Sequence, residues 1–209
     1  MEKLDLTKKY KSYYNARAIP ELVDIEPAGF LSIRGKGDPD GPLFGTKIQA
    51  LYATAYTIKF TFKEQGKDFV VAKLEGLWWF NESRYQHIIM EEAPKAIPRS
   101  EWEYRLLIRM PSFVTKNDVE RGIQHTLFKK QLETCREIEF FEMDEGKCVQ
   151  IMHIGPFATE PESLLKMNAF MKTRGLAQNG RHHEIYLSDF RKTDAKKLRT
   201  ILREPVKLP

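Results

Sequence analysis

Hydrophobic positions in the first half of the chain change spacing from one segment to the next. Apolar residues recur at steps of three and four over residues 43–60, which predicts a helix. Pro42 stands just before its first turn, where a missing N–H does no harm. Strand-like runs lie at 23–34, 68–79 and 102–110. The half therefore predicts the order strand, helix, strand, strand. The helical stripe consists of Phe44, Ile48, Leu51, Tyr52, Ala55 and Ile58.

The second half repeats that order. Strands are predicted at 147–155, 182–189 and 198–205, and a helix at 160–174. Sequence identity between the halves is low, so the order of elements carries the comparison. Two such units packed side by side leave a groove at their junction, which is a common place for a ligand site.

Local signals mark the ends of the later helices. Thr115 with Asp118 three residues on predicts an N-terminal capping box, and Thr159 with Glu162 predicts another. Gly175 takes the position favoured just after a helix end.

Two further segments complete the prediction. Residues 136–155 are expected to form a hairpin that turns at 144–146. Residues 1–20 are polar and predict a lead-in arm with one short helix. The chain as a whole predicts an α+β fold of duplicated β-α-β-β units with pseudo-twofold symmetry and a ligand cleft between the halves. We expect one domain over residues 1–209, with halves of about 20–112 and 113–209.

Composition limits the class of protein. Hydrophobic residues make up 42% of the 209-residue chain, enough for a core. No run approaches the roughly 20 apolar residues of a membrane span, and the N-terminus lacks the apolar stretch of a secretory signal. Cys135 and Cys148 form no CxxC motif, which is typical of a reducing compartment. We therefore expect a cytoplasmic protein that does not bind membranes.

The charge balance does not indicate direct binding to nucleic acid. The net charge of +5 comes from 34 basic and 29 acidic residues spread along the chain. The densest basic stretch, residues 191–203, has the spacing of a solvated surface.

Two glutamates stand in the middle of predicted strands. Side chains alternate across a strand, so Glu184 shares a face with His182 and Tyr186. That polar face favours a solvent-facing glutamate; the alternative is a general base in a partly apolar cleft. Glu75 shares its face with more apolar residues, among them Trp79, and is the better candidate on local pattern.

Aromatic residues gather in the first half. All three tryptophans lie there, and Trp102 shares a strand face with Tyr104. Core packing accounts for any single tryptophan. A pair of aromatic rings beside a carboxylate also holds flat or cationic ligands by stacking and by attraction to the ring face.

Motifs for metal or cofactor chemistry are missing. There is no HExxH sequence and no cysteine–histidine cluster, and His182 and His183 point to opposite faces of a strand. Gly35-Lys36-Gly37 is read as a turn. We predict no metal and no cofactor; an enzyme of this kind would work with carboxylates, aromatic side chains and water.

Four segments together resemble the GyrI-like small-molecule-binding family. They are Arg34–Pro39, Leu74–Trp79, His153–Pro156 and His183–Asp189. Their order and joint presence carry the resemblance, which covers about residues 20–206.

The resemblance implies duplicated β-α-β-β architecture and a ligand cleft that contains the glutamate matching Glu184. Members include drug-sensing domains of transcription activators, a gyrase inhibitor, and stand-alone hydrolases that open the cyclopropane ring of DNA-alkylating natural products. Relatives often carry a tyrosine where this chain has Phe157, so a hydroxyl is missing here.

The resemblance and the strand pattern together give a candidate site. Glu184 and Tyr104 are expected to be catalytic. The expected ligand-binding residues are Glu75, Trp79, Trp102, Tyr186, Phe157 and Tyr52.

Three functions remain open at this stage. The first is a detoxifying, cofactor-independent hydrolase of cyclopropane-bearing aromatic electrophiles. The second is a multidrug-binding module that sequesters such compounds or serves as a transcription co-regulator. The third is a protein–protein inhibitor of a topoisomerase. An aromatic small molecule is the expected partner in the first two, and the oligomeric state cannot be predicted from the sequence.

Overall fold

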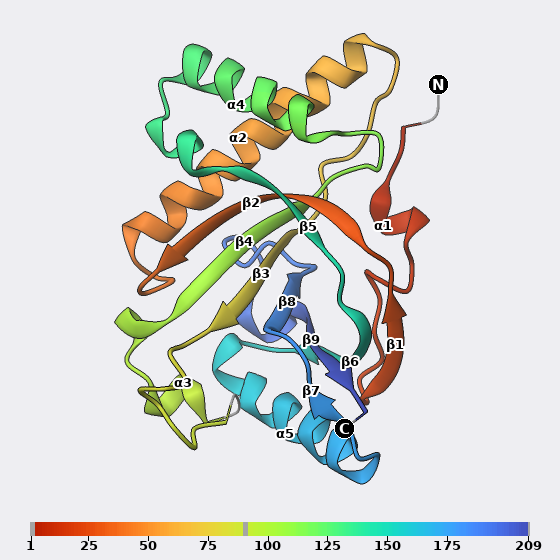
Figure 1. Cartoon of the computed structure of the whole chain (residues 1–209), viewed down its shortest axis with the longest axis vertical. Coiled ribbons are helices and arrows are strands. Elements are labelled where there is room, and N and C mark those ends of the chain that lie inside the picture. The colour runs from red at the N-terminus through yellow and green to blue at the C-terminus, as the bar shows by residue number, and fades with distance from the viewer. Residues whose placement is uncertain (1–2, 90–91, 209) are drawn as a thin grey trace.

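The computed structural model describes residues 3–89 and 92–208 and has an α+β fold built on one antiparallel sheet (Figure 1). Helices α2 and α4 occupy the top of the view and α5 the bottom, with the curled sheet between them. The helices are α1 (Leu6–Lys9), α2 (Pro42–Glu64), α3 (Ala93–Ala96), α4 (Lys116–Lys130) and α5 (Glu160–Thr173). The strands are β1 (Glu21–Ile25), β2 (Ala28–Lys36), β3 (Leu74–Trp79), β4 (Glu103–Arg109), β5 (Glu139–Met143), β6 (Gly146–Ile154), β7 (Ala177–Gln178), β8 (His182–Tyr186) and β9 (Arg199–Lys207).

The order of strands across the sheet confirms the predicted duplication. The order is β1-β6-β9-β8-β3-β4-β2-β5, with β7 added beside β9. Exchanging β1 with β5, β2 with β6, β3 with β8 and β4 with β9 reproduces the same order read backwards. Helix α2 corresponds to α5 in this exchange, and the two halves meet where β3 pairs with β8.

Strands that follow one another closely along the chain lie near opposite ends of the strand order, which shows that the sheet curls on itself. Only residues 26–27 separate β1 from β2, and only residues 144–145 separate β5 from β6. Yet β1 pairs with β6, and β5 pairs with β2. The predicted hairpin over 136–155 is therefore wrong. Its two strands, β5 and β6, lie near opposite ends of the strand order and do not pair with each other.

The outer face of the curled sheet is covered by α2 and α5. From α2, Phe44 packs against Trp78 and Tyr104, with ring centroids 5.9 and 5.0 Å away. From α5, Leu164 and Met167 pack in a cluster with residues of β6 and β9. This outer face is also the one that carries Glu184, because Glu184 lies opposite Leu202 of that cluster.

Most of the predicted helix ends are confirmed. Pro42 begins α2, and Thr115 and Asp118 form a reciprocal capping box. Gly175 follows α5 with a φ of 61°, a left-handed conformation that glycine adopts without strain. The capping box predicted at Thr159 is wrong, since its hydroxyl donates to the carbonyl of Pro156 and caps no helical N–H.

The inner face of the sheet holds a buried polar network centred on Glu75. The Glu75 carboxylate accepts hydrogen bonds from the hydroxyls of Tyr13 and Tyr14 and lies 3.0 Å from His183 Nε2. His183 Nδ1 lies 3.0 Å from the carboxylate of Glu145. Arg203 donates to the carbonyl of Tyr13 at 2.7 Å. The network therefore joins the N-terminal arm to three regions of the sheet.

The neighbours His182 and His183 each lie between two carboxylates, on opposite faces of the sheet. On the outer face, His182 Nδ1 lies 2.7 Å from Glu204 and Nε2 lies 3.4 Å from Glu184. Burial alone would lower the pKa of His182, but the carboxylates of Glu204 and Glu184 outweigh it and raise the pKa to about 10. The pKa of His183 is raised in the same way by Glu145 and Glu75.

None of the helices in residues 3–89 and 92–208 combines the length and apolar character needed to cross a membrane.

The pKa of His182 predicts how stability depends on pH. An unfolded histidine releases its proton near pH 6.5, whereas folded His182 keeps its proton until about pH 10. The folded state binds more protons between these values, so the free energy of unfolding should fall as pH rises from about 7 to 10. Urea unfolding of His182→Gln should show a shallower fall than the wild type. The control is His125→Gln, at an exposed position. If the unfolding free energy of His182→Gln fell with pH as steeply as that of the wild type, the raised pKa of His182 would be contradicted.

The inner network predicts that Glu75 is required for stability. Glu75→Gln keeps the size of the side chain but leaves His183 with one carboxylate partner fewer. Removing one member of a buried ion pair costs about 3–5 kcal/mol, so the urea midpoint should fall clearly. Glu142→Gln, on exposed β5 surface, should change stability by no more than about 0.5 kcal/mol. Equal midpoints for Glu75→Gln and the wild type would show that the network does not hold the fold.

Candidate functional site

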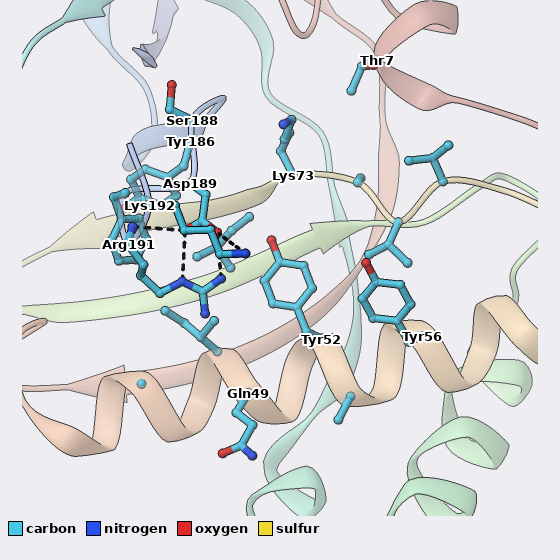
Figure 2. Close-up of a pocket in the computed structure, with 18 of the residues that line it drawn as sticks. Thr7, Gln49, Tyr52, Tyr56, Lys73, Tyr186, Ser188, Asp189, Arg191 and Lys192 are labelled. Atoms are coloured by element: carbon cyan, nitrogen blue, oxygen red, sulfur yellow. Dashed lines mark hydrogen bonds and ion pairs between the residues drawn. The ribbon is translucent and has the colours of Figure 1, made fainter. Parts of the chain in front are cut away.

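A cleft of about 840 Å³ opens beside α2, and we call it the α2 cleft (Figure 2). One wall is α2 from Gly45 to Tyr56. The other walls are residues 70–74, which lead into β3, and residues 186–192, which follow β8. The prediction extended the strand back to residue 68, but regular pairing begins only at Leu74. The earlier residues are therefore free to line the cleft.

Aromatic rings form two walls of the α2 cleft. Tyr52 and Tyr56 come from successive turns of α2, with ring centroids 6.4 Å apart, and Figure 2 shows both rings rising from the helix on the same side. Across from them, Tyr186 and Phe190 pack edge to face at 6.0 Å. The space between suits a flat apolar molecule.

Cations outnumber anions along the cleft. Arg191 and Lys192 approach Asp189, with Nε–O and Nζ–O distances of 3.0 and 4.0 Å (Figure 2). Lys73 and Lys130 also line the cleft and make no ion pair within the described ranges 3–89 and 92–208. Such a cleft favours a neutral or anionic ligand with an accessible oxygen over a cation.

Tyr186 connects the cleft to Glu184. Its hydroxyl accepts a hydrogen bond of 2.9 Å from the indole N–H of Trp78. Burial raises the pKa of Tyr186 well above its usual value, and the nearby Glu184 carboxylate raises it further. A Cβ on Gly76 would come within 3.0 Å of both Trp78 Nε1 and the Tyr186 hydroxyl. Glycine at position 76 is therefore what allows this bond to form.

Glu184 keeps a small opening to solvent. Its side chain is 12% exposed, whereas that of its neighbour His182 is only 3% exposed. Part of the Glu184 side chain is therefore open to solvent, while His182 at 3.4 Å holds its carboxylate in place.

Glu160, at the start of α5, is a second carboxyl near Glu184. It is buried, and its Oε1 has no hydrogen-bond partner among the residues the structure describes. Burial, and after it the charge of Glu184, raises the pKa of Glu160 well above its usual value. Both effects favour the neutral, protonated form of Glu160. The sequence marked this residue only as part of a helix start.

The structure brings together four of the predicted site residues. Tyr52 and Tyr186 line the α2 cleft, and Glu184 lies behind Tyr186. The ring of Phe157 lies 5.9 Å from that of Tyr186 and is partly exposed. Sequence reasoning missed Lys73, because it was placed inside the predicted strand.

The structure separates Glu75 from this group, which corrects the prediction of a shared cleft. Glu75 lies opposite Ile185 and Gly76 lies opposite Glu184, so the two carboxylates are on opposite faces of the sheet. Glu75 is 0% exposed and fully engaged in the inner network.

Three predicted aromatic residues also lie elsewhere. Tyr104 is 1% exposed and packs beneath Phe44, so its hydroxyl cannot reach a ligand in the α2 cleft. Trp102 packs edge to face on Trp78 at 6.2 Å and does not line the cleft. Trp79 lines a different cleft, beside α5.

Comparison with known proteins agrees with this fold. The family model described as GyrI-like small molecule binding domain matches residues 19–207. The solved structure of an uncharacterized conserved protein from Listeria innocua is 36% identical, with a TM-score of 0.87 over 98% of this chain and 100% of that one. The structure of a hydrolase from Listeria innocua is also 36% identical, with the same coverage and a TM-score of 0.84.

A more distant structure shares the fold alone. The C-terminal domain of EcmrR is 12% identical, with a TM-score of 0.55 over 91% of this chain and 98% of that domain. A search of curated proteins found no match. The family model spans nearly the whole chain, and the strand order has the duplication that the resemblance implies. The chain belongs to the family of GyrI-like small-molecule-binding domains.

Proposed function

We propose that this protein binds flat aromatic molecules in the α2 cleft and hydrolyses cyclopropane-bearing electrophiles there, with Glu184 as the general base. The observation that carries the proposal is that Glu184 shares a face of β8 with Tyr186, which lines the cleft, and lies behind it. The similar Listeria innocua structure described as a hydrolase supports an enzymatic role.

Binding would use the aromatic walls and the unpaired cations. A flat ring system fits between Tyr52 on α2 and Tyr186 with Phe190 on the opposite wall. The ammonium of Lys73 is then available to a carbonyl oxygen of the ligand. This gives Lys73 the second catalytic role beside Glu184, which the sequence predicted for Tyr104, because Tyr104 is buried away from the cleft.

The reaction adds water to a strained ring. In a cyclopropane conjugated to a dienone, the water oxygen bonds to a ring carbon while Glu184 accepts a proton from that water. The ring carbon–carbon bond breaks, and its electron pair passes through the conjugated system to the carbonyl oxygen, which becomes a phenolate. Lys73 stabilises this negative charge, and the phenolate regains a proton from Glu184 through solvent. The product is an aromatic phenol that carries a new hydroxyl group, and no oxidant or cofactor is consumed.

Binding without turnover is the second candidate function. It is favoured by the position of Glu184, which lies 3.4 Å from His182 and behind the cleft wall formed by Tyr186. A protein of this kind would protect a target by holding the electrophile at one molecule per site.

The proposal predicts that Glu184→Gln removes catalysis and spares binding. The amide keeps the shape of the side chain but cannot accept the proton of the attacking water. Single-turnover rates should fall by at least about a hundredfold, the usual contribution of a positioned base. Affinity for a neutral aromatic ligand should change little, as measured by a separate titration.

Two matched variants complete this test. Exposed Glu162→Gln, on the surface of α5, should keep wild-type rates. Tyr52→Ala should show the opposite pattern, with affinity weakened by roughly 1–3 kcal/mol through lost apolar contact. Unchanged turnover in Glu184→Gln would show that Glu184 is not the base. Stoichiometric protection without turnover by the wild type would favour the binding function.

A further inference from the structure

A second cleft, of about 670 Å³, opens beside α5, and we call it the α5 cleft. Its walls are α5 from Leu164 to Lys172, residues 176–182, which lead into β8, and residues 78–89, from the end of β3 onward. Among the described residues, its lining shares no member with that of the α2 cleft. The two clefts are therefore separate cavities in the same chain.

The duplication of the fold relates the two clefts to each other. When the two halves are exchanged, α2 corresponds to α5. The segment before β3 then corresponds to the segment before β8, and the segment after β8 corresponds to the segment after β3. Each wall of the α2 cleft thus has its counterpart in the α5 cleft. The hydrogen bond from Trp78 to Tyr186 lies between them, since Trp78 lines the α5 cleft and Tyr186 the α2 cleft.

The surfaces of the α5 cleft suit an aromatic ligand. Trp79 at the end of β3 and Tyr85 in the segment after it supply rings, and Met167 and Met171 supply flexible apolar side chains from α5. The methionines can adjust to the outline of a flat ring system. The buried polar pair in the lining, His182 with Glu204, is already satisfied, because its members bond each other at 2.7 Å.

The edge of the α5 cleft supplies unpaired positive charge. The guanidinium of Arg181 stacks on the ring of Trp79 at 3.5 Å from its centroid, and Lys172 lies on the α5 side. Neither makes an ion pair with any residue in 3–89 or 92–208. Glu82 is the exposed anion of the lining, and the carboxylate of Glu204 is bound by His182 and Gln178.

We propose that the α5 cleft is a second binding site, independent of the α2 cleft, for flat aromatic molecules that carry a carboxylate or sulfonate. The ring system stacks among Trp79, Tyr85 and the methionines. The anionic group lies at the edge of the cleft, where Arg181 is held flat against Trp79 with its N–H groups free to donate. One chain can then hold two aromatic ligands, one beside each helix.

An anilinonaphthalene sulfonate, a fluorescent aromatic anion, tests this proposal by calorimetric titration of the full chain. At least one site should lose affinity about tenfold or more in Arg181→Gln, through loss of the charge-assisted contact. The same site should weaken in Trp79→Ala and stay unchanged in Tyr52→Ala. Arg181→Lys should weaken binding less than Arg181→Gln, because it keeps the charge and loses the stacking and the paired donors.

Controls separate this site from the α2 cleft and from unfolding. Each variant should keep a cooperative urea unfolding transition, since this dye also binds loosened proteins. Arg181 is exposed, so Arg181→Gln tests the site even if Trp79→Ala unfolds. The proposal is overturned if every dye site keeps its affinity in Arg181→Gln. A site that depends on Tyr52 but not on Arg181 would support the α2 cleft alone.

Discussion

The antiparallel pairing of β3 with β8 is the constraint on which the rest of the structure depends. It joins the two halves of the sheet and sets Gly76 opposite Glu184. Because side chains alternate along a strand, Glu184 and Tyr186 face outward while His183 and Ile185 face inward. A shift of one residue in this register would exchange the two sets. One five-residue strand thus supplies both the candidate catalytic carboxylate and part of the network that holds the core.

The partners of each buried carboxylate decide which of them is available for chemistry. Glu75 has two tyrosine hydroxyls and His183, whose pKa is raised, around it, so the cost of burying its charge is offset and its position is fixed. Glu160 has an oxygen with no partner in the described chain, and burial raises its pKa and so favours its neutral form. Glu184 is an intermediate case, because His182 holds its carboxylate while its side chain remains partly open to solvent. That combination of support and access is what a general base needs.

Much of the fold could be predicted from local pattern. The helices at α2, α4 and α5 follow from three-and-four spacing and end signals, and the shared face of His182, Glu184 and Tyr186 follows from strand alternation. What failed depends on distant partners. Glu75 looked like a cleft residue because its partner Tyr13 is 62 residues away in the sequence.

The errors over Tyr104 and the hairpin have the same origin. Phe44 buries Tyr104 only because α2 packs back on β4. The hairpin over 136–155 carries ordinary turn residues, and only the curl of the whole sheet sends its strands to different neighbours. Lys73 lines the cleft because it lies just before β3, in which regular pairing begins at Leu74. Local sequence does not contain these long-range contacts.

A crystal structure of the chain with an unreactive aromatic analogue of the proposed substrate tests the central claim most directly. We expect the ring system to lie between Tyr52 and Tyr186, with the Glu184 carboxylate reaching the reacting carbon directly or through one water. The inner contacts of Glu75 with Tyr13 and His183 should be unchanged. A ligand bound on the inner face in contact with Glu75, with Tyr13 displaced, would contradict the account.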